Sequence, residues 1–125
     1  MELKKGMYIR IKDKNNNQFI RKIIELPEDI RYGSIVVDKD IHYARWVSKK
    51  NIVKASANII DLIEEGDYVN GSKVEKITTF NGMNFVDTYM TQGYGWGTCI
   101  PENEIRTVVT REQFENMMYI VESED

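Results

Sequence analysis

Residues 2–10 read ELKKGMYIR, and residues 62–70 read LIEEGDYVN. In both stretches two like charges precede a glycine, and a tyrosine followed by an aliphatic residue then opens a strand-like run. A second apolar run follows each stretch, and each half ends near an isoleucine after a charged segment. The chain is therefore predicted to consist of two related units, residues 1–55 and 58–125, with Ser56-Ala57-Asn58 as the linker.

The two units carry opposite charge. Up to residue 55 there are 13 Lys and Arg against 7 Asp and Glu, a net charge of +6, and beyond it there are 4 against 13, a net charge of −9. Such asymmetry usually concerns binding partners more than folding. Units of about 55 residues bury only about 60% of their unfolded surface. We therefore expect the two units to pack together, which their opposite charges would favour.

The pattern of apolar residues is that of β-structure. Residues 7–12 alternate Met, Ile and Ile with Tyr, Arg and Lys, the period-2 pattern of a half-buried strand. Further strands are expected at 19–26, 35–37, 41–46 and 52–53, and the second unit repeats the plan. Asn70-Gly71 and Asn81-Gly82 are strong signals for two-residue hairpin turns, because Asn and Gly tolerate positive φ.

One helix is expected, near residues 110–118. Thr110-Arg111-Glu112-Gln113 has the form of a capping box, and Phe114, Met117 and Met118 then supply an apolar stripe. With short strands, closely spaced turns and this one helix, the predicted fold is mainly β. It comprises two tandem SH3-like small β-barrel units with a short C-terminal helix.

Two segments carry a resemblance to a known group of proteins. Residues 58–71, NIIDLIEEGDYVNG, and residues 108–115, VVTREQFE, with Tyr119 and Val121, resemble a family of small proteins from phages and prophages of Gram-positive bacteria. The first unit matches that family only in outline. The resemblance implies a phage or prophage origin. It also implies a small phage accessory protein. Such proteins are often inhibitors of host defence, and anti-CRISPR proteins are among them.

No catalytic constellation is apparent, so an enzyme is not expected. The single histidine, His42, and the single cysteine, Cys99, fall in different units. We expect a strand histidine and a buried cysteine rather than a nucleophile and its base. No metal or cofactor is expected either, since there is no Cys or His cluster and no phosphate loop. The lone cysteine and the absence of a signal or membrane-spanning segment predict a protein of the bacterial host cytoplasm.

The most unusual local sequence is residues 92–97, QGYGWG. A flexible loop could present Tyr94 and Trp96 as anchors for a partner, because aromatic residues dominate binding hot spots. Alternatively, the glycines allow a bulged strand that packs Trp96 into the core. Trp46, which precedes the last strand of the first unit, supports this second interpretation. Both stay open.

Charged residues suggest two further binding modes. If Ile9 and Ile11 point inward, Tyr8, Arg10 and Lys12 share the outer face of one strand, an arrangement suited to single-stranded nucleic acid. Glu64, Glu65 and Asp67 form a predicted solvated acidic turn, and carboxylates can occupy a basic channel by imitating phosphates. A nucleotide-binding pocket between units or protomers, and a homodimer, are left open.

The sequence thus favours a non-enzymatic phage or prophage accessory protein that binds a host protein or ribonucleoprotein complex. Its sharpest version is a defence (anti-CRISPR) inhibitor, with Tyr94, Trp96 and the acidic turn as partner-binding residues. The alternative is a nucleic-acid-binding module that uses the basic first unit.

Overall fold

The computed structural model describes residues 2–28, 33–89 and 98–117. These residues are mainly β-structure with one short α-helix, as the sequence predicts. The first sheet contains β1 (Tyr8–Lys12), β2 (Gln18–Glu25), β3 (Ile35–Ile41), β4 (Ala44–Val47) and β5 (Ile52–Ser56). The second contains β6 (Tyr68–Val69), β7 (Ser72–Phe80), β8 (Met83–Thr88), β9 (Cys99–Pro101) and β10 (Val108–Val109). The helix is α1 (Arg111–Met117).

The two sheets have the same topology. The first has the order β4-β3-β2-β1-β5 and the second the order β10-β6-β7-β8-β9. Each is an antiparallel four-stranded meander whose first strand also pairs with the last strand of the unit. A single turn of 3-10 helix precedes that last strand in each unit, η1 (Lys49–Asn51) and η3 (Glu102–Glu104). Both sheets are open, because no pairing among the described residues joins the two outer strands.

The repeat extends to individual hydrogen bonds. Gly6 has φ +93° and Gly66 has φ +94°, a conformation that L side chains avoid. The Gly6 amide donates to the Ile23 carbonyl at 2.8 Å, and the Gly66 amide donates to the Val74 carbonyl at 3.0 Å. The same β-entry is therefore built twice, which explains why the glycine stands at one place in both quoted stretches.

Each unit has its own apolar core. Five aliphatic side chains, each at most 2% exposed, form the first core: Ile9, Ile11, Ile23, Ile35 and Val37. Six form the second: Ile60, Ile63, Val69, Val74, Val86 and Ile100. The alternation along β1 thus places Ile9 and Ile11 inward, as predicted. The helical turn η2 (Ile59–Leu62) connects the units and supplies Ile60 to the second core.

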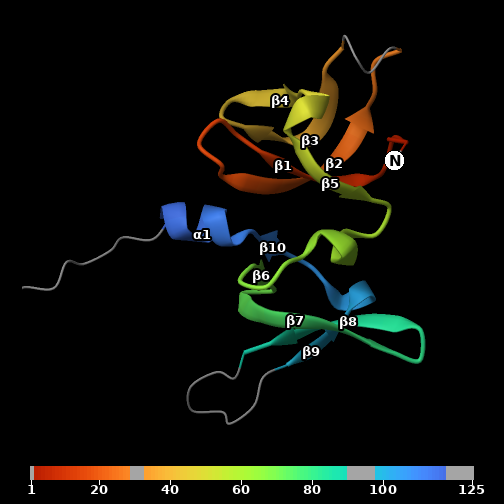
Figure 1. The fold of residues 1–125 in the computed structure, drawn as a ribbon, viewed down its shortest axis with the longest axis vertical. Helices are drawn as coiled ribbons and strands as arrows, with labels where there is room; N and C mark the ends of the chain where they lie inside the picture. The colour runs from red at the N-terminus through yellow and green to blue at the C-terminus, as the bar shows by residue number, and fades with distance from the viewer. Residues whose placement is uncertain (1, 29–32, 90–97, 118–125) are drawn as a thin grey trace, which may run out of the picture.

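The units stack end to end, and α1 lies beside their junction (Figure 1). The helix comes from the second half of the chain, yet it contacts β2 of the first sheet. The helix and its capping box are confirmed: the Gln113 amide donates to Thr110 Oγ1 at 3.2 Å, and the Thr110 amide reaches Gln113 Oε1 at 3.4 Å. No helix within the described ranges is long and apolar enough to cross a membrane.

The two predicted Asn-Gly turns are confirmed, whereas one predicted strand is wrong. Asn70-Gly71 and Asn81-Gly82 both adopt positive φ between paired strands, as predicted. The expected strand at 41–46 is wrong, because a two-residue turn at His42 and Tyr43 divides it into the end of β3 and β4. Both turn residues have positive φ, 50° and 73°. Neither is Asn or Gly, so the usual signal for such a turn is missing from the sequence.

Candidate functional site

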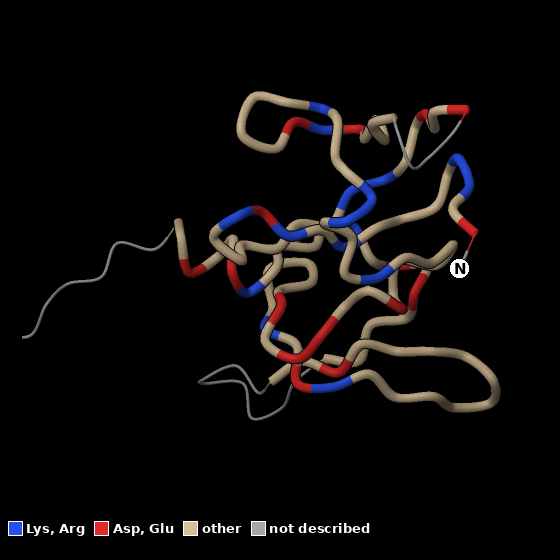
Figure 2. Tube along the Cα trace, turned by 45° about the horizontal axis from the view of Figure 1, so that its top comes forward, with Lys and Arg blue, Asp and Glu red and all other residues tan. Residues whose placement is uncertain are grey.

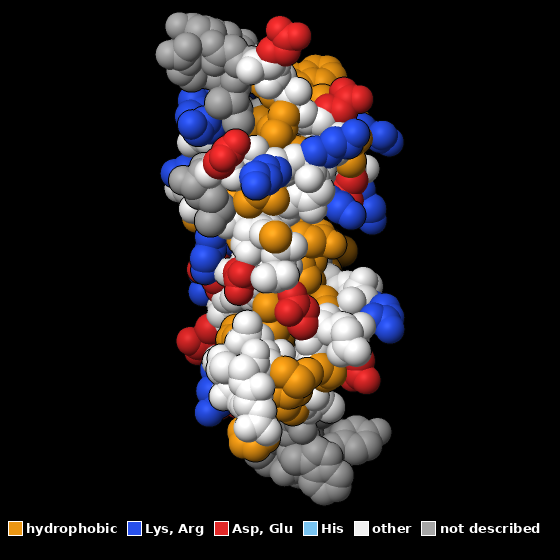
Figure 3. Space-filling model, turned by 90° about the vertical axis from the view of Figure 1, so that its right-hand side faces the viewer, with side chains coloured by type: hydrophobic (Ala, Val, Ile, Leu, Met, Phe, Trp, Pro, Cys, Tyr) orange, Lys and Arg blue, Asp and Glu red, His pale blue; other side chains and the backbone are white. Residues whose placement is uncertain are grey.

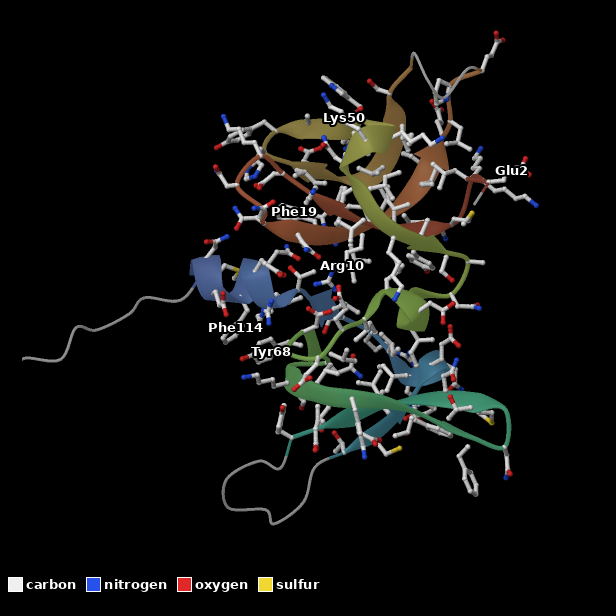
Figure 4. The ribbon with its side chains drawn as sticks, viewed as in Figure 1. Glu2, Arg10, Phe19, Lys50, Tyr68 and Phe114 are labelled. Atoms are coloured by element: carbon white, nitrogen blue, oxygen red, sulfur yellow. The ribbon has the colours of Figure 1, made fainter. Side chains whose placement is uncertain are left out.

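The centre of the molecule is a buried arginine at the junction of the two units. Because Ile9 and Ile11 fill the first core, the intervening Arg10 points from the opposite face of β1 toward the second unit (Figure 4). Only 2% of Arg10 is exposed. The second unit therefore covers this part of the strand face that the sequence predicted to be open.

Most hydrogen-bond and ion-pair partners of Arg10 come from the second unit, which is acidic. Its Nη1 donates to Asp67 Oδ2 at 2.5 Å and to the Leu62 carbonyl at 3.0 Å, and its Nη2 donates to Asp67 Oδ1 at 3.1 Å. Glu64 Oε2 lies 2.7 Å from Nε, and Glu112 Oε2 lies 3.4 Å from Nη2. Burial lowers the pKa of Arg10, but the hydrogen bond and charge of Asp67, together with the charges of Glu64 and Glu112, outweigh it and leave the pKa raised.

Asp67 is held from several directions. It follows Gly66 at the entry to β6, and it is fully buried. Its carboxylate accepts the Glu64 amide at 2.8 Å and the Arg111 amide at 3.0 Å, in addition to the Arg10 guanidinium. One side chain thus joins the strand entry, the first turn of α1 and the first unit. The corresponding residue of the first unit is Met7, so this role belongs to the second unit alone.

The helix adds a second set of contacts across the junction. Thr110 Oγ1 donates to the Gln18 carbonyl at the start of β2, at 2.5 Å. Asn116 Nδ2 donates to Asn17 Oδ1 at 2.6 Å. On the side of α1 that faces the second unit, the Phe114 ring stacks on Tyr68 with 4.0 Å between centroids (Figure 4). Acidic and basic positions accordingly lie close together along the trace where the units meet (Figure 2).

Two predictions of solvent exposure are wrong because of these contacts. The predicted exposed face of Tyr8, Arg10 and Lys12 is wrong, because Arg10 is buried, Tyr8 is half-buried and only Lys12 is exposed. The predicted solvated position of Asp67 is also wrong, because its carboxylate is buried beneath Arg10. The reason is the same in both cases: the alternation gives the correct face of the strand, but not the unit that packs on it.

The other predicted partner-binding residues differ in accessibility. Glu64 is half exposed although it contacts Arg10, and Glu65 is exposed and accepts a hydrogen bond from the Tyr89 hydroxyl at 3.1 Å. That bond is the main cause of a raised pKa of Tyr89. Tyr94 and Trp96 lie outside the described residues. Trp46 is 62% exposed, so its position in the first unit does not support a core position for Trp96 in the second.

His42 and Cys99 show no sign of a shared site. His42 Nε2 lies 2.8 Å from Asp13 Oδ2 and its ring packs edge-on against Phe19, which ties two turns of the first unit together. Cys99 is exposed on β9 of the second unit, not buried as expected. Desolvation and a hydrogen bond to Asp87 raise the pKa of its thiol, which disfavours the nucleophilic thiolate. Among the described residues, no group of three or more His, Cys, Asp or Glu is placed to hold a metal ion.

The β7–β8 hairpin carries a feature that sequence reasoning missed. Phe80 and Met83 are paired across the Asn81-Gly82 turn, and they are 70% and 55% exposed. A groove of about 380 Å³ runs beside this tip, lined by Met83, Asn84, Glu102 and Asn103 among others. Figure 3 shows hydrophobic side chains at the surface of the lower, second unit, while Lys and Arg gather over the first. The sequence signal was present, because both apolar residues flank a recognised turn.

Comparison of the chain with protein-family models, with curated proteins and with solved structures found no match in any of the three.

Proposed function

We propose that this protein is a non-enzymatic phage or prophage accessory protein that binds a basic host protein or ribonucleoprotein complex through its second unit. The observation that carries the proposal is the hairpin tip, where Phe80 and Met83 stand exposed beside the acidic turn η3. Large exposed apolar side chains rimmed by polar ones are typical of interaction surfaces. Aromatic anchors of this kind commonly supply much of the binding energy.

Charge defines the class of partner. The second unit has a net charge of −9. Arg10 neutralises the buried Asp67, but Glu65, Glu102 and Glu104 lie outside that cluster, and Glu65 and Glu104 are exposed. An acidic surface with an apolar anchor suits a partner that has a positively charged channel or groove, such as a protein that handles nucleic acid. An RNA-guided defence nuclease is the sharpest member of that class, and the resemblance to phage proteins points the same way.

The proposed architecture is a pair of SH3-like units. The shared strand order and the 3-10 turn before the last strand of each unit support it. Small β-units of this kind commonly present ligands on loops and hairpin tips rather than in a deep pocket. Within this proposal, residues 92–97 are a second contact segment of the same unit.

Affinity capture from the lysate of a Gram-positive host tests the proposal. The wild-type chain is expected to retain a nucleic-acid-handling protein, and Phe80→Ser/Met83→Ser is expected to lose it. Tyr43→Ser is the matched control, because Tyr43 is a fully exposed aromatic residue on a hairpin turn of the other unit. The captured protein is then purified and its activity measured with and without this chain. The proposal fails if the wild type retains no specific protein, or if the tip variant retains it as well as the control does.

A further inference from the structure

A second groove lies between the two units, away from the hairpin tip. It has a volume of about 400 Å³, within the range of small-molecule sites. One wall comes from β1, β2 and β3, including Tyr8, Lys22 and Lys39. The other comes from the approach to β10 and from Ile59, and includes Arg106.

The lining is strongly cationic for a protein with a net charge of −3. Four of its side chains are basic, Arg21, Lys22, Lys39 and Arg106, and one is acidic, Asp38. Asp38 Oδ1 accepts the backbone amide of Lys22 at 3.0 Å, so part of its bonding capacity is used within the sheet. Burial lowers the pKa of Arg21, and the charge of Asp38 offsets this only in part. The Arg21 Nη1 and Nη2 donate to the Ile20 and Asp40 carbonyls, whereas its Nε has no hydrogen-bond partner among the described residues. An anionic ligand is therefore favoured in this groove.

The groove also has an apolar and aromatic part. Ile20, Ile59, Val108 and Val109 line it, and the Tyr8 ring lies half-buried there, with Lys22 Nζ 5.8 Å from the ring centroid. A ligand with a flat apolar ring and an attached anion would use both parts. The ring would pack on Tyr8 and the aliphatic wall, and the anion would meet the ammonium and guanidinium groups.

We propose that this groove binds a nucleoside phosphate, with its base against Tyr8 and its phosphates near Lys22, Lys39 and Arg106. The site is independent of the hairpin tip and of the partner proposed above. It differs from the strand-face arrangement predicted from the sequence, because Arg10 lies in the buried junction and basic residues of β2, β3 and the segment before β10 take its place. The phosphate could belong to a free nucleotide or to one residue of a single strand, and the test separates these sources.

The experiment measures binding of the full chain to three probes at low salt by calorimetry: ATP, inorganic triphosphate and a ten-residue oligothymidylate. ATP is expected to bind more tightly than triphosphate, because only ATP has a base to pack on Tyr8. Equal or tighter binding of the oligonucleotide would support the same site with a strand as the source. Failure to bind any nucleoside phosphate would overturn the proposal, as would equal affinity for triphosphate and for both base-bearing probes.

Two variants locate the binding. Lys22→Glu/Lys39→Glu is expected to weaken it by about tenfold or more, since each lost charge-assisted contact is among the stronger hydrogen bonds. Lys49→Glu/Lys50→Glu is the matched control, because it makes the same charge change at exposed positions on η1 that do not line the groove. Thermal unfolding checks that both variants fold. Equal losses in the two variants would show non-specific attraction and would overturn the site, while loss in the groove variant alone supports it.

Discussion

Arg10 of the first unit and Asp67 of the second form a two-point ion pair, with Nη1 2.5 Å from Oδ2 and Nη2 3.1 Å from Oδ1. Their side chains are 2% and 1% exposed. A charge taken out of water this completely requires a counter-charge. The first unit supplies the guanidinium and the second unit supplies the carboxylate. The opposite charges of the two halves are therefore used, in part, to join them.

The first prediction compares the two acidic partners of Arg10. Asp67→Asn is expected to lower the free energy of unfolding by about 3 kcal/mol or more, because it leaves a buried guanidinium without its main counter-charge. Glu64→Gln removes a carboxylate that is half exposed, and we expect a loss below about 1 kcal/mol. Urea denaturation measures both. Equal losses would contradict the assignment of Asp67 as the main partner.

The second prediction concerns the repeated glycines. Alanine at either position must adopt positive φ, which costs about 1–2 kcal/mol. At Gly66 the added Cβ would also lie 3.1 Å from Arg111 Cδ, whereas at Gly6 nothing lies within 4 Å. Gly66→Ala should therefore lower the free energy of unfolding more than Gly6→Ala does, as measured by denaturant titration. A larger effect at Gly6 would be inconsistent with the contact between the β6 entry and the first turn of α1.

The third prediction concerns the helix cap. Thr110→Ala removes the acceptor of the Gln113 amide and the donor to the Gln18 carbonyl. Loss of a cap alone destabilises by about 1 kcal/mol, and the lost contact to the first unit should add to it. Thr110→Ser, which keeps the hydroxyl, is the control. Hydrogen exchange should be faster in α1 of the alanine variant, and unchanged exchange there would argue against the capping role.

The fourth prediction concerns pH. Burial raises the pKa of Asp13, but hydrogen bonds from His42, from the Asn15 and Asn17 amides and from the Asn17 side chain outweigh it, so the pKa is lowered from its ordinary value of 3.8. A carboxylate with a lowered pKa stabilises the fold above its ordinary pKa, and this stabilisation is lost as the pH falls through the lowered value. Asp13→Asn should thus reduce the urea midpoint at neutral pH, with a difference from wild type that shrinks in acid. A difference that stays constant would contradict it.

Much of the fold could be predicted from local pattern. The two Asn-Gly turns, the capping box and the inward isoleucines of β1 depend on neighbouring residues, so the sequence reports them directly. The turn at His42 and Tyr43 could not be predicted, because the pair lacks the Asn, Asp or Gly that usually signals a two-residue hairpin turn. The prediction of closed barrels is not supported, because no described strand pairing joins the two outer strands of either sheet.

The site was harder to predict than the fold. Alternation along β1 correctly separates Arg10 from Ile9 and Ile11, but it cannot tell a solvent-facing surface from one that another unit covers. The burial of Asp67 could not be predicted for the same reason, since its partner Arg10 lies 57 residues away in the chain. The groove between the units combines β1–β3 with the approach to β10, and only the packing of the two units brings these together.

The most direct test of the central claim, that Arg10 and Asp67 join the two units, is a double-mutant cycle with Arg10→Met, Asp67→Leu and the double variant. The free energy of unfolding is measured for all four proteins by urea denaturation. We predict a coupling of at least about 2 kcal/mol, with the double variant more stable than the sum of the single losses implies. Additive losses, with a coupling near zero, would contradict the claim.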